Sequence, residues 1–178
     1  MFQSEINVPF ANTYWVIPHQ FLAGEHPSEL DERITVEKLA ALLDAGVRSF
    51  VNLTEEREKM QCYSHLLQTL ATDRRIAVEI LRIPIPDRGV PSAETLRSIL
   101  DVIDGSVAKK NPVFVHCFAG VGRTGTIVGC YLKRHGQAKE QDVIEKISEL
   151  RRWMPGGNEA SPHTPEQIQV VKNWKEGS

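Results

Sequence analysis

The chain has 178 residues, 41% of them hydrophobic and 25% charged, with a formal net charge of −2 at pH 7. This size and composition are typical of one ordinary globular domain, so we expect a single domain over residues 1–178. The near-neutral charge argues against nucleic acid as a partner, and the sequence offers neither a signal peptide nor an apolar run long enough for membrane insertion. The expectation is a monomer in the cytoplasm.

Strand and helix patterns alternate along the chain. In chain order, we expect a strand at Tyr14–Ile17, a helix at Thr35–Ala45, strands at Arg48–Leu53 and Val78–Ile83, a helix capped by Ser92 and running through Val107, a strand at Val113–His116, and helices at Arg123–His135, Lys139–Trp153 and Thr164–Lys175. This order predicts an α/β fold with a central, mostly parallel sheet flanked by helices. A short N-terminal hairpin is expected to add an edge to the sheet.

The three cysteines, Cys62, Cys117 and Cys130, cannot all pair with one another, and their spacing does not resemble that of a zinc site. Free thiols in a reducing compartment are the simpler interpretation. We expect no cofactor and no bound metal.

The run VFVHCFAGVGRTG, residues 113–125, combines a buried strand, a glycine-containing loop and the start of a helix. Gly120 and Gly122 allow the loop to curl so that backbone N–H groups converge, and the N-terminus of the following helix adds further donors and a positive dipole. Such a loop favours a bound dianion. We therefore predict that the run from Cys117 to Arg123 binds phosphate, with these residues between the two ends: Phe118, Ala119, Gly120, Val121 and Gly122.

The same positive surroundings favour the thiolate of Cys117, which is a competent nucleophile. Arg123 can hold two phosphate oxygens with its planar guanidinium and stay charged in the transition state. Thr124 is placed to donate its hydroxyl toward the Cys117 sulfur and so ease departure of the thiolate, although it also suits the first turn of a helix.

Residues 116–125 match the pattern H-C-x-x-G-x-G-R-T-G and resemble the signature of the protein tyrosine phosphatase superfamily, including its dual-specificity members. Segments near Tyr14 and after Thr126 extend the resemblance to the compact, atypical dual-specificity group. The resemblance implies a cysteine-dependent enzyme that hydrolyses phosphotyrosine in protein or peptide substrates, with phosphoserine and phosphothreonine as further candidates, through a phosphocysteine intermediate. It also implies that His116 fixes the geometry of Cys117.

Displacement of a phosphate ester needs a proton for the leaving oxygen, and a carboxylic acid is the natural donor. The run Pro86-Asp-Arg-Gly-Val-Pro91 resembles the mobile acid loop of tyrosine phosphatases, with Ile85 where the larger enzymes carry tryptophan. Asp87 is then the general acid, and in the second step it takes a proton from water. The alternative is a turn residue whose carboxylate binds backbone amides.

Two further residues receive supporting roles. Gln167 lies in a segment that resembles the region carrying a glutamine near the site of small dual-specificity phosphatases, which implies that it orients the attacking water; a capping box with Thr164 is the alternative. Arg57 follows the carboxyl end of a predicted strand and is assigned to loop bracing or substrate contact, against the alternative of a solvated charge.

Two other functions remain open. The Asn52-Leu-Thr-Glu-Glu-Arg57 run resembles a loop in the lipid-acting branch of the superfamily and so suggests a phosphoinositide or inositol-phosphate phosphatase. Against this, Val121 occupies a position where that branch typically has lysine. A pseudophosphatase that binds phosphate without hydrolysing it is the other alternative.

Overall fold

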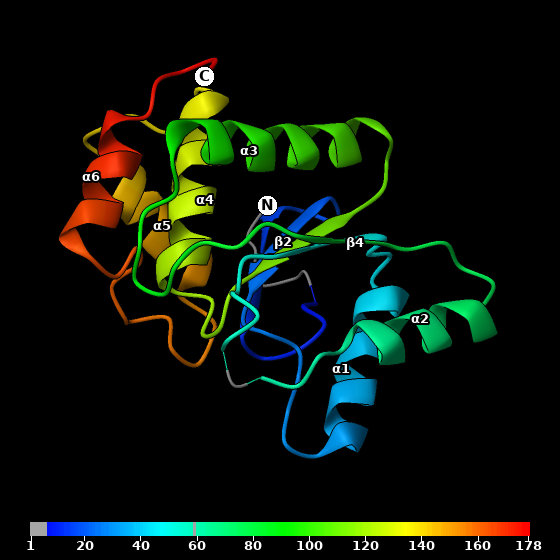
Figure 1. Ribbon diagram of the computed structural model, residues 1–178. Helices are drawn as coiled ribbons and strands as arrows, with labels where there is room; N and C mark the ends of the chain where they lie inside the picture. Colours follow the sequence, from blue (N-terminus) through cyan, green and yellow to red (C-terminus); the bar gives the residue numbers. More distant parts are fainter. Residues whose placement is uncertain (1–6, 59) are drawn as a thin grey trace.

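The computed structural model describes residues 7–58 and 60–178, and in these residues one five-stranded sheet forms the centre of the molecule (Figure 1). The strands are β1 (Thr13–Ile17), β2 (Phe21–Gly24), β3 (Ser49–Asn52), β4 (Glu79–Arg82) and β5 (Val113–His116), in the order β1-β2-β5-β3-β4. The β1–β2 pair is antiparallel and the other pairs are parallel. The predicted mostly parallel sheet, with a hairpin at its edge, is confirmed.

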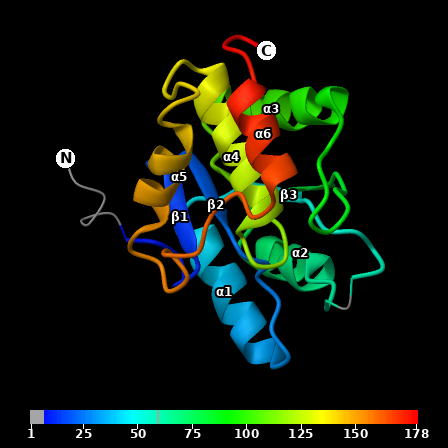
Figure 2. The same ribbon diagram turned by 90° about the vertical axis from the view of Figure 1, so that its left-hand side faces the viewer.

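Helices cover both faces of this sheet. They are α1 (Glu32–Asp44), α2 (Ser64–Asp73), α3 (Ala93–Ala108), α4 (Gly122–Arg134), α5 (Val143–Arg151) and α6 (Pro165–Asn173). Figure 1 shows α1 and α2 on one side and α3 to α6 on the other, and Figure 2 shows α4 and α6 side by side. No helix in the described part of the chain is long and apolar enough to cross a membrane.

Alternation along the strands divides the core in two. Successive strand side chains point to opposite faces, so Phe50 and Phe114 pack on the α1–α2 side, whereas Val51 and Val115 pack against α3 to α6. All four side chains are fully buried. Because β5 lies between β2 and β3 at the centre of the sheet, the Cys117 loop begins at the carboxyl ends of the parallel strands.

Some predicted boundaries were wrong. Helix α1 begins at Glu32 rather than Thr35 because the Asp31 carboxylate accepts the Arg33 N–H at 2.9 Å and so provides an earlier cap. Helix α5 begins at Val143 rather than Lys139 because the Asp142 carboxylate binds the Lys139 N–H at 2.6 Å and holds the preceding residues in a turn.

Other strands and helices differ from the prediction by one or two residues at their ends. β3 and β4 are each one residue shorter at both ends than predicted, α4 lies one residue earlier, α5 ends at Arg151 rather than Trp153, and α6 ends at Asn173 rather than Lys175. The predicted caps are confirmed: Ser92 accepts the Thr95 N–H, and Thr164 and Gln167 form a capping box. Helix α2 was not predicted.

Candidate active site

The Cys117 loop connects the end of β5 to the start of α4. The Cys117 residue is only 3% exposed, and the Arg123 side chain is equally enclosed. Gly120 has φ +70°, and a Cβ there would lie 2.5 Å from the Gly24 carbonyl carbon. A Cβ on Gly122 would lie 2.9 Å from Oε1 of Gln167. The tight curl of the loop therefore depends on glycine at position 120, whereas Gly122 leaves room for the Gln167 side chain.

A pocket of about 130 Å³ opens above this loop. Its lining brings together three chain segments: the phosphate-loop residues Cys117, Phe118, Ala119, Val121, Gly122 and Arg123, the acid-loop residues Asp87 and Arg88, and Glu159, His163 and Gln167 from around the start of α6. Most residues predicted for the site thus meet at one pocket. His116, Gly120, Thr124 and Arg57 do not line it.

Arg123 is held by a carboxylate that the sequence did not single out. Its Nη1 and Nη2 atoms contact Oε1 and Oε2 of Glu58 at 2.5 and 2.9 Å. Nη1 also donates to the Ile85 carbonyl at 3.1 Å, and Nη2 lies 3.3 Å from Oδ1 of Asp87. The guanidinium therefore ties the phosphate loop to the acid loop.

The charges of this pair stabilise each other. Burial raises the pKa of Glu58, but the hydrogen bonds from Arg123 and from the Glu55 N–H outweigh it, and the net pKa lies below its ordinary value. Burial lowers the pKa of Arg123, and the Glu58 hydrogen bond together with the Cys117 charge reverses this, so its net pKa is raised. Both groups stay ionised at neutral pH.

The acid loop is a tight turn. The Gly89 N–H donates to the Pro86 carbonyl at 2.8 Å, and Arg88 has φ +58°, a left-handed conformation that is uncommon for a residue with a side chain. The Asp87 side chain at the tip is 66% exposed. Nε2 of Gln167 donates to the Gly89 carbonyl at 3.0 Å, which connects this turn to the start of α6.

Behind the phosphate loop lies a buried aromatic cluster of Tyr63, His116 and His26. The Tyr63 hydroxyl lies 2.8 Å from Nε2 of His116, and Nδ1 of His116 lies 3.3 Å from the Cys117 carbonyl. One tautomer satisfies both contacts, with Tyr63 donating to Nε2 and the Nδ1–H group donating to Cys117. This chain of hydrogen bonds leads from α2 to the backbone of Cys117.

His26 supports the same loop from the end of β2. Its backbone N–H donates to the Phe118 carbonyl at 2.9 Å, and its ring meets that of His116 edge-on. Burial, together with the charge of Arg82, lowers the pKa of His26 to about 4. Burial also lowers the pKa of His116 well below its ordinary value. Both rings are therefore neutral at pH 7.

The remaining predicted residues lie as follows. The buried Thr124 hydroxyl donates to the Gly24 carbonyl at 3.4 Å. Oε1 of Gln167 accepts the backbone N–H groups of His163 and Thr164 at 3.1 and 3.2 Å. The Arg57 side chain is largely exposed and pairs with Glu55 at 3.0 Å. In the loop that follows β3, the side chain that contacts Arg123 is therefore Glu58 and not Arg57.

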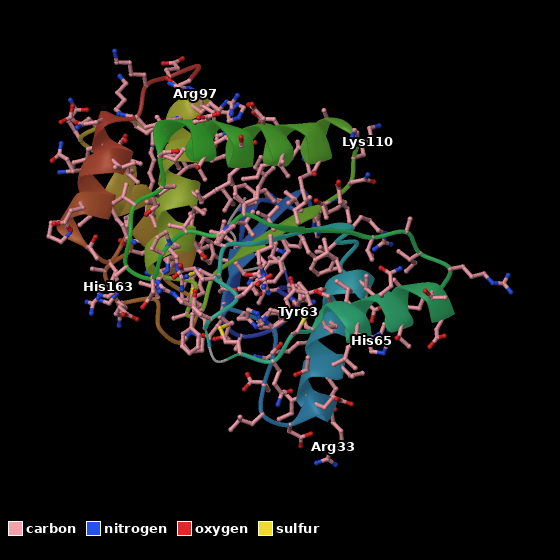
Figure 3. The ribbon with its side chains drawn as sticks, viewed as in Figure 1. Arg33, Tyr63, His65, Arg97, Lys110 and His163 are labelled. Atoms are coloured by element: carbon pink, nitrogen blue, oxygen red, sulfur yellow. The ribbon has the colours of Figure 1, made fainter. Side chains whose placement is uncertain are left out.

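The segment between α5 and α6 forms the third wall of the pocket. The buried Arg151 donates to the Glu159 carbonyl at 2.6 Å and to the Gly156 carbonyl at 3.3 Å. The Ser161 hydroxyl donates to the Val121 carbonyl at 2.7 Å, which joins this segment to the phosphate loop. Figure 3 shows His163 where this segment approaches α6, and Tyr63 close to α2.

Known proteins resemble this arrangement in sequence and in structure. A family model described as "Polymorphic toxin system, DSP-PTPase phosphatase" matches residues 28–137. The mouse dual specificity protein phosphatase CDC14B is 36% identical over 95 residues, covering 52% of this chain and 18% of that relative. The mouse phosphatidylglycerophosphatase and protein-tyrosine phosphatase 1 is 28% identical over 162 residues, covering 90% of this chain and 75% of the relative.

A solved structure shares the fold. The crystal structure of Tk-PTP in the active form superposes with a TM-score of 0.71 and 25% identity, covering 93% of this chain and 97% of the other. The family model spans more than half of the chain and includes the whole run from Cys117 to Arg123 as well as Asp87. The chain therefore belongs to this DSP-PTPase family of phosphatases, within the protein tyrosine phosphatase superfamily.

Proposed function

We propose that the protein is a cysteine-dependent phosphatase that hydrolyses phosphotyrosine in protein or peptide substrates. The observation that carries this proposal is the convergence of Cys117, Arg123 and Asp87 on one pocket, with Asp87 3.3 Å from the Arg123 guanidinium. These residues supply the nucleophile, the phosphate-binding cation and the acid that the reaction needs.

In the first step, the Cys117 thiolate attacks phosphorus, and an S–P bond forms as the ester P–O bond breaks. The proton of the Asp87 carboxyl group passes to the leaving oxygen. Arg123 and the N–H groups at the start of α4 bind the phosphoryl oxygens while their charge is redistributed. The carboxylate of Glu58 holds the guanidinium in place throughout.

In the second step, water attacks the phosphorus of the phosphocysteine and gives a proton to the Asp87 carboxylate. The S–P bond breaks, phosphate leaves, and Cys117 returns to the thiolate. Thr124 would assist the departing sulfur after its hydroxyl rotates away from Gly24. For Gln167 we propose a role in placing the water, since one N–H of its Nε2 group remains for the pocket beside the Gly89 contact.

The pocket charges favour a substrate with a single phosphate group. Among the described residues that line it, the fixed cations are Arg88 and Arg123, and Arg123 is already paired with Glu58. A phosphoinositide with several phosphate groups would need more cations. The lipid alternative retains support in the name of the mouse relative, a phosphatidylglycerophosphatase as well as a protein-tyrosine phosphatase.

A substrate panel tests this proposal. The wild-type protein should hydrolyse p-nitrophenyl phosphate and phosphotyrosyl peptides, and Cys117→Ser should abolish both activities while keeping its circular dichroism spectrum. Turnover retained by Cys117→Ser would show that Cys117 is not the nucleophile. A clear preference for phosphoinositides would favour the lipid alternative. Peptide binding without turnover by the wild-type protein would indicate a pseudophosphatase.

A further inference from the structure

The direction of attack determines which residues meet the rest of the substrate. A phosphoryl group at the Cys117 loop is bound by the backbone N–H groups of that loop and by Arg123. The leaving group lies opposite the attacking sulfur in an in-line displacement and therefore points out of the loop, toward the side chains at the mouth of the pocket.

One side of this mouth is apolar. The Phe118 side chain follows the nucleophile directly in the chain, lines the pocket and is 59% exposed. Its backbone is fixed because the His26 N–H donates to its carbonyl at 2.9 Å. A phenyl ring on this fixed backbone, exposed at the edge of the pocket, offers an aromatic leaving group an apolar contact.

Another part of the mouth carries a carboxylate. Glu159 lines the pocket, and its backbone is fixed by the buried Arg151 and by its own N–H bond to the Gly156 carbonyl at 3.0 Å. Within the described part of the chain, the Glu159 carboxylate forms no ion pair. Such a charge repels a phosphate dianion unless the substrate brings a cation beside it.

We propose that Phe118 and Glu159 select the substrate: a phosphotyrosyl segment whose aromatic ring packs on Phe118 and whose neighbouring basic side chain pairs with Glu159. This inference rests on the proposed function. It deepens that function by naming the sequence context of the phosphotyrosine. A basic neighbour neutralises Glu159, whereas an acidic neighbour adds a second repulsion.

Three phosphotyrosyl peptides that differ only in the residue beside phosphotyrosine test the role of Glu159. With the wild-type protein, the lysine peptide should have a KM about threefold below that of the alanine peptide, and the glutamate peptide a KM about threefold above it, as expected for a solvent-exposed charge pair. Glu159→Gln should remove most of this spread, and salt should reduce it. Glu140→Gln, at an exposed carboxylate outside the pocket, is the matched control and should keep it.

The role of Phe118 is tested by Phe118→Ala. Loss of the apolar contact should raise KM about tenfold for the phosphotyrosyl peptides and less for the matching phosphoserine peptide, whose leaving group has no ring. Equal effects on both peptides would overturn the Phe118 contact. Equal KM values for the three flanking peptides, or a spread unchanged in Glu159→Gln, would overturn the Glu159 contact.

The proposed function and the substrate selection by Glu159 can be tested separately. If the wild-type protein turns over p-nitrophenyl phosphate in a Cys117-dependent manner but shows no flanking preference, the proposed function stands and the selection by Glu159 does not. If no phosphomonoester is turned over, the proposed function itself fails.

Discussion

Replacement of His26 by glutamine should make the fold less sensitive to acid. The folded pKa of His26 is about 4, against an ordinary value of 6.5. The ring is therefore neutral in the fold, while the unfolded chain takes up a proton below pH 6.5. The stability that results is present above pH 6.5 and is lost progressively as the pH falls toward about 4.

The size of the effect follows from this shift. At about 1.36 kcal/mol for each pKa unit, the shift corresponds to about 3 kcal/mol when fully expressed, of which about 2 kcal/mol is lost between pH 7 and pH 4.5. Urea unfolding at both pH values, for the wild-type protein and His26→Gln, measures it. Contributions from groups far from His26 cancel in the comparison; that of the neighbouring His116 does not cancel fully, because His26 is one of the causes that lower its pKa. An equal loss of unfolding free energy in the two proteins would show that His26 does not cause the sensitivity to acid.

Three other substitutions probe the site. Asp87→Asn should lower kcat at least about 100-fold for substrates with poor leaving groups and much less for p-nitrophenyl phosphate, measured by steady-state kinetics. Glu58→Gln should lower kcat/KM by about 10- to 100-fold, because the Arg123 guanidinium loses its ionic partner and its fixed position; an unchanged value would contradict this role. Gly120→Ala should lower the free energy of unfolding by more than about 1 kcal/mol in urea titrations, because the new Cβ meets the Gly24 backbone at 2.5 Å and φ is +70°.

Local signals in the sequence predicted the parts of the site that lie within one segment. The run from Cys117 to Arg123 contains its strand, its glycines and its helix start in consecutive residues, and the structure joins them as expected. Asp87 was found through its own short motif, and it lies beside the arginine. Strong apolar patterns likewise predicted four of the five strands and every helix except α2, while β2 was expected only as part of an N-terminal hairpin.

Contacts between segments that are distant in the chain could not be predicted from the sequence. Glu58 lies 65 positions from Arg123 in the chain, yet their side chains are in contact. The sequence around Glu58 is a run of charged residues, and the family resemblance pointed to Arg57 in that run. His26 and Tyr63 lie outside every motif, and their link to His116 appears only when β2, β5 and the start of α2 are brought together. Helix α2 was missed because Leu67 and Ala71 are its only fully buried side chains, too few for a clear period.

Gln167 makes more than one kind of contact at the pocket. The sequence predicts either a water-placing role or a capping-box role for Gln167. Its Oε1 atom accepts two N–H groups at the start of α6, while its Nε2 atom donates to the acid loop. The capping geometry and a position at the pocket therefore occur together, because α6 begins where the three walls of the pocket meet.

Rapid acid quenching during turnover shows whether Cys117 carries the phosphoryl group. The wild-type protein is mixed with excess p-nitrophenyl phosphate and quenched within a few milliseconds, and its peptides are examined by mass spectrometry. A phosphoryl group should be found on Cys117, and it should be absent from Cys62, Cys130 and the Cys117→Ser protein. Turnover in the wild-type protein without label on Cys117, combined with undiminished turnover in Cys117→Ser, would contradict the proposed chemistry.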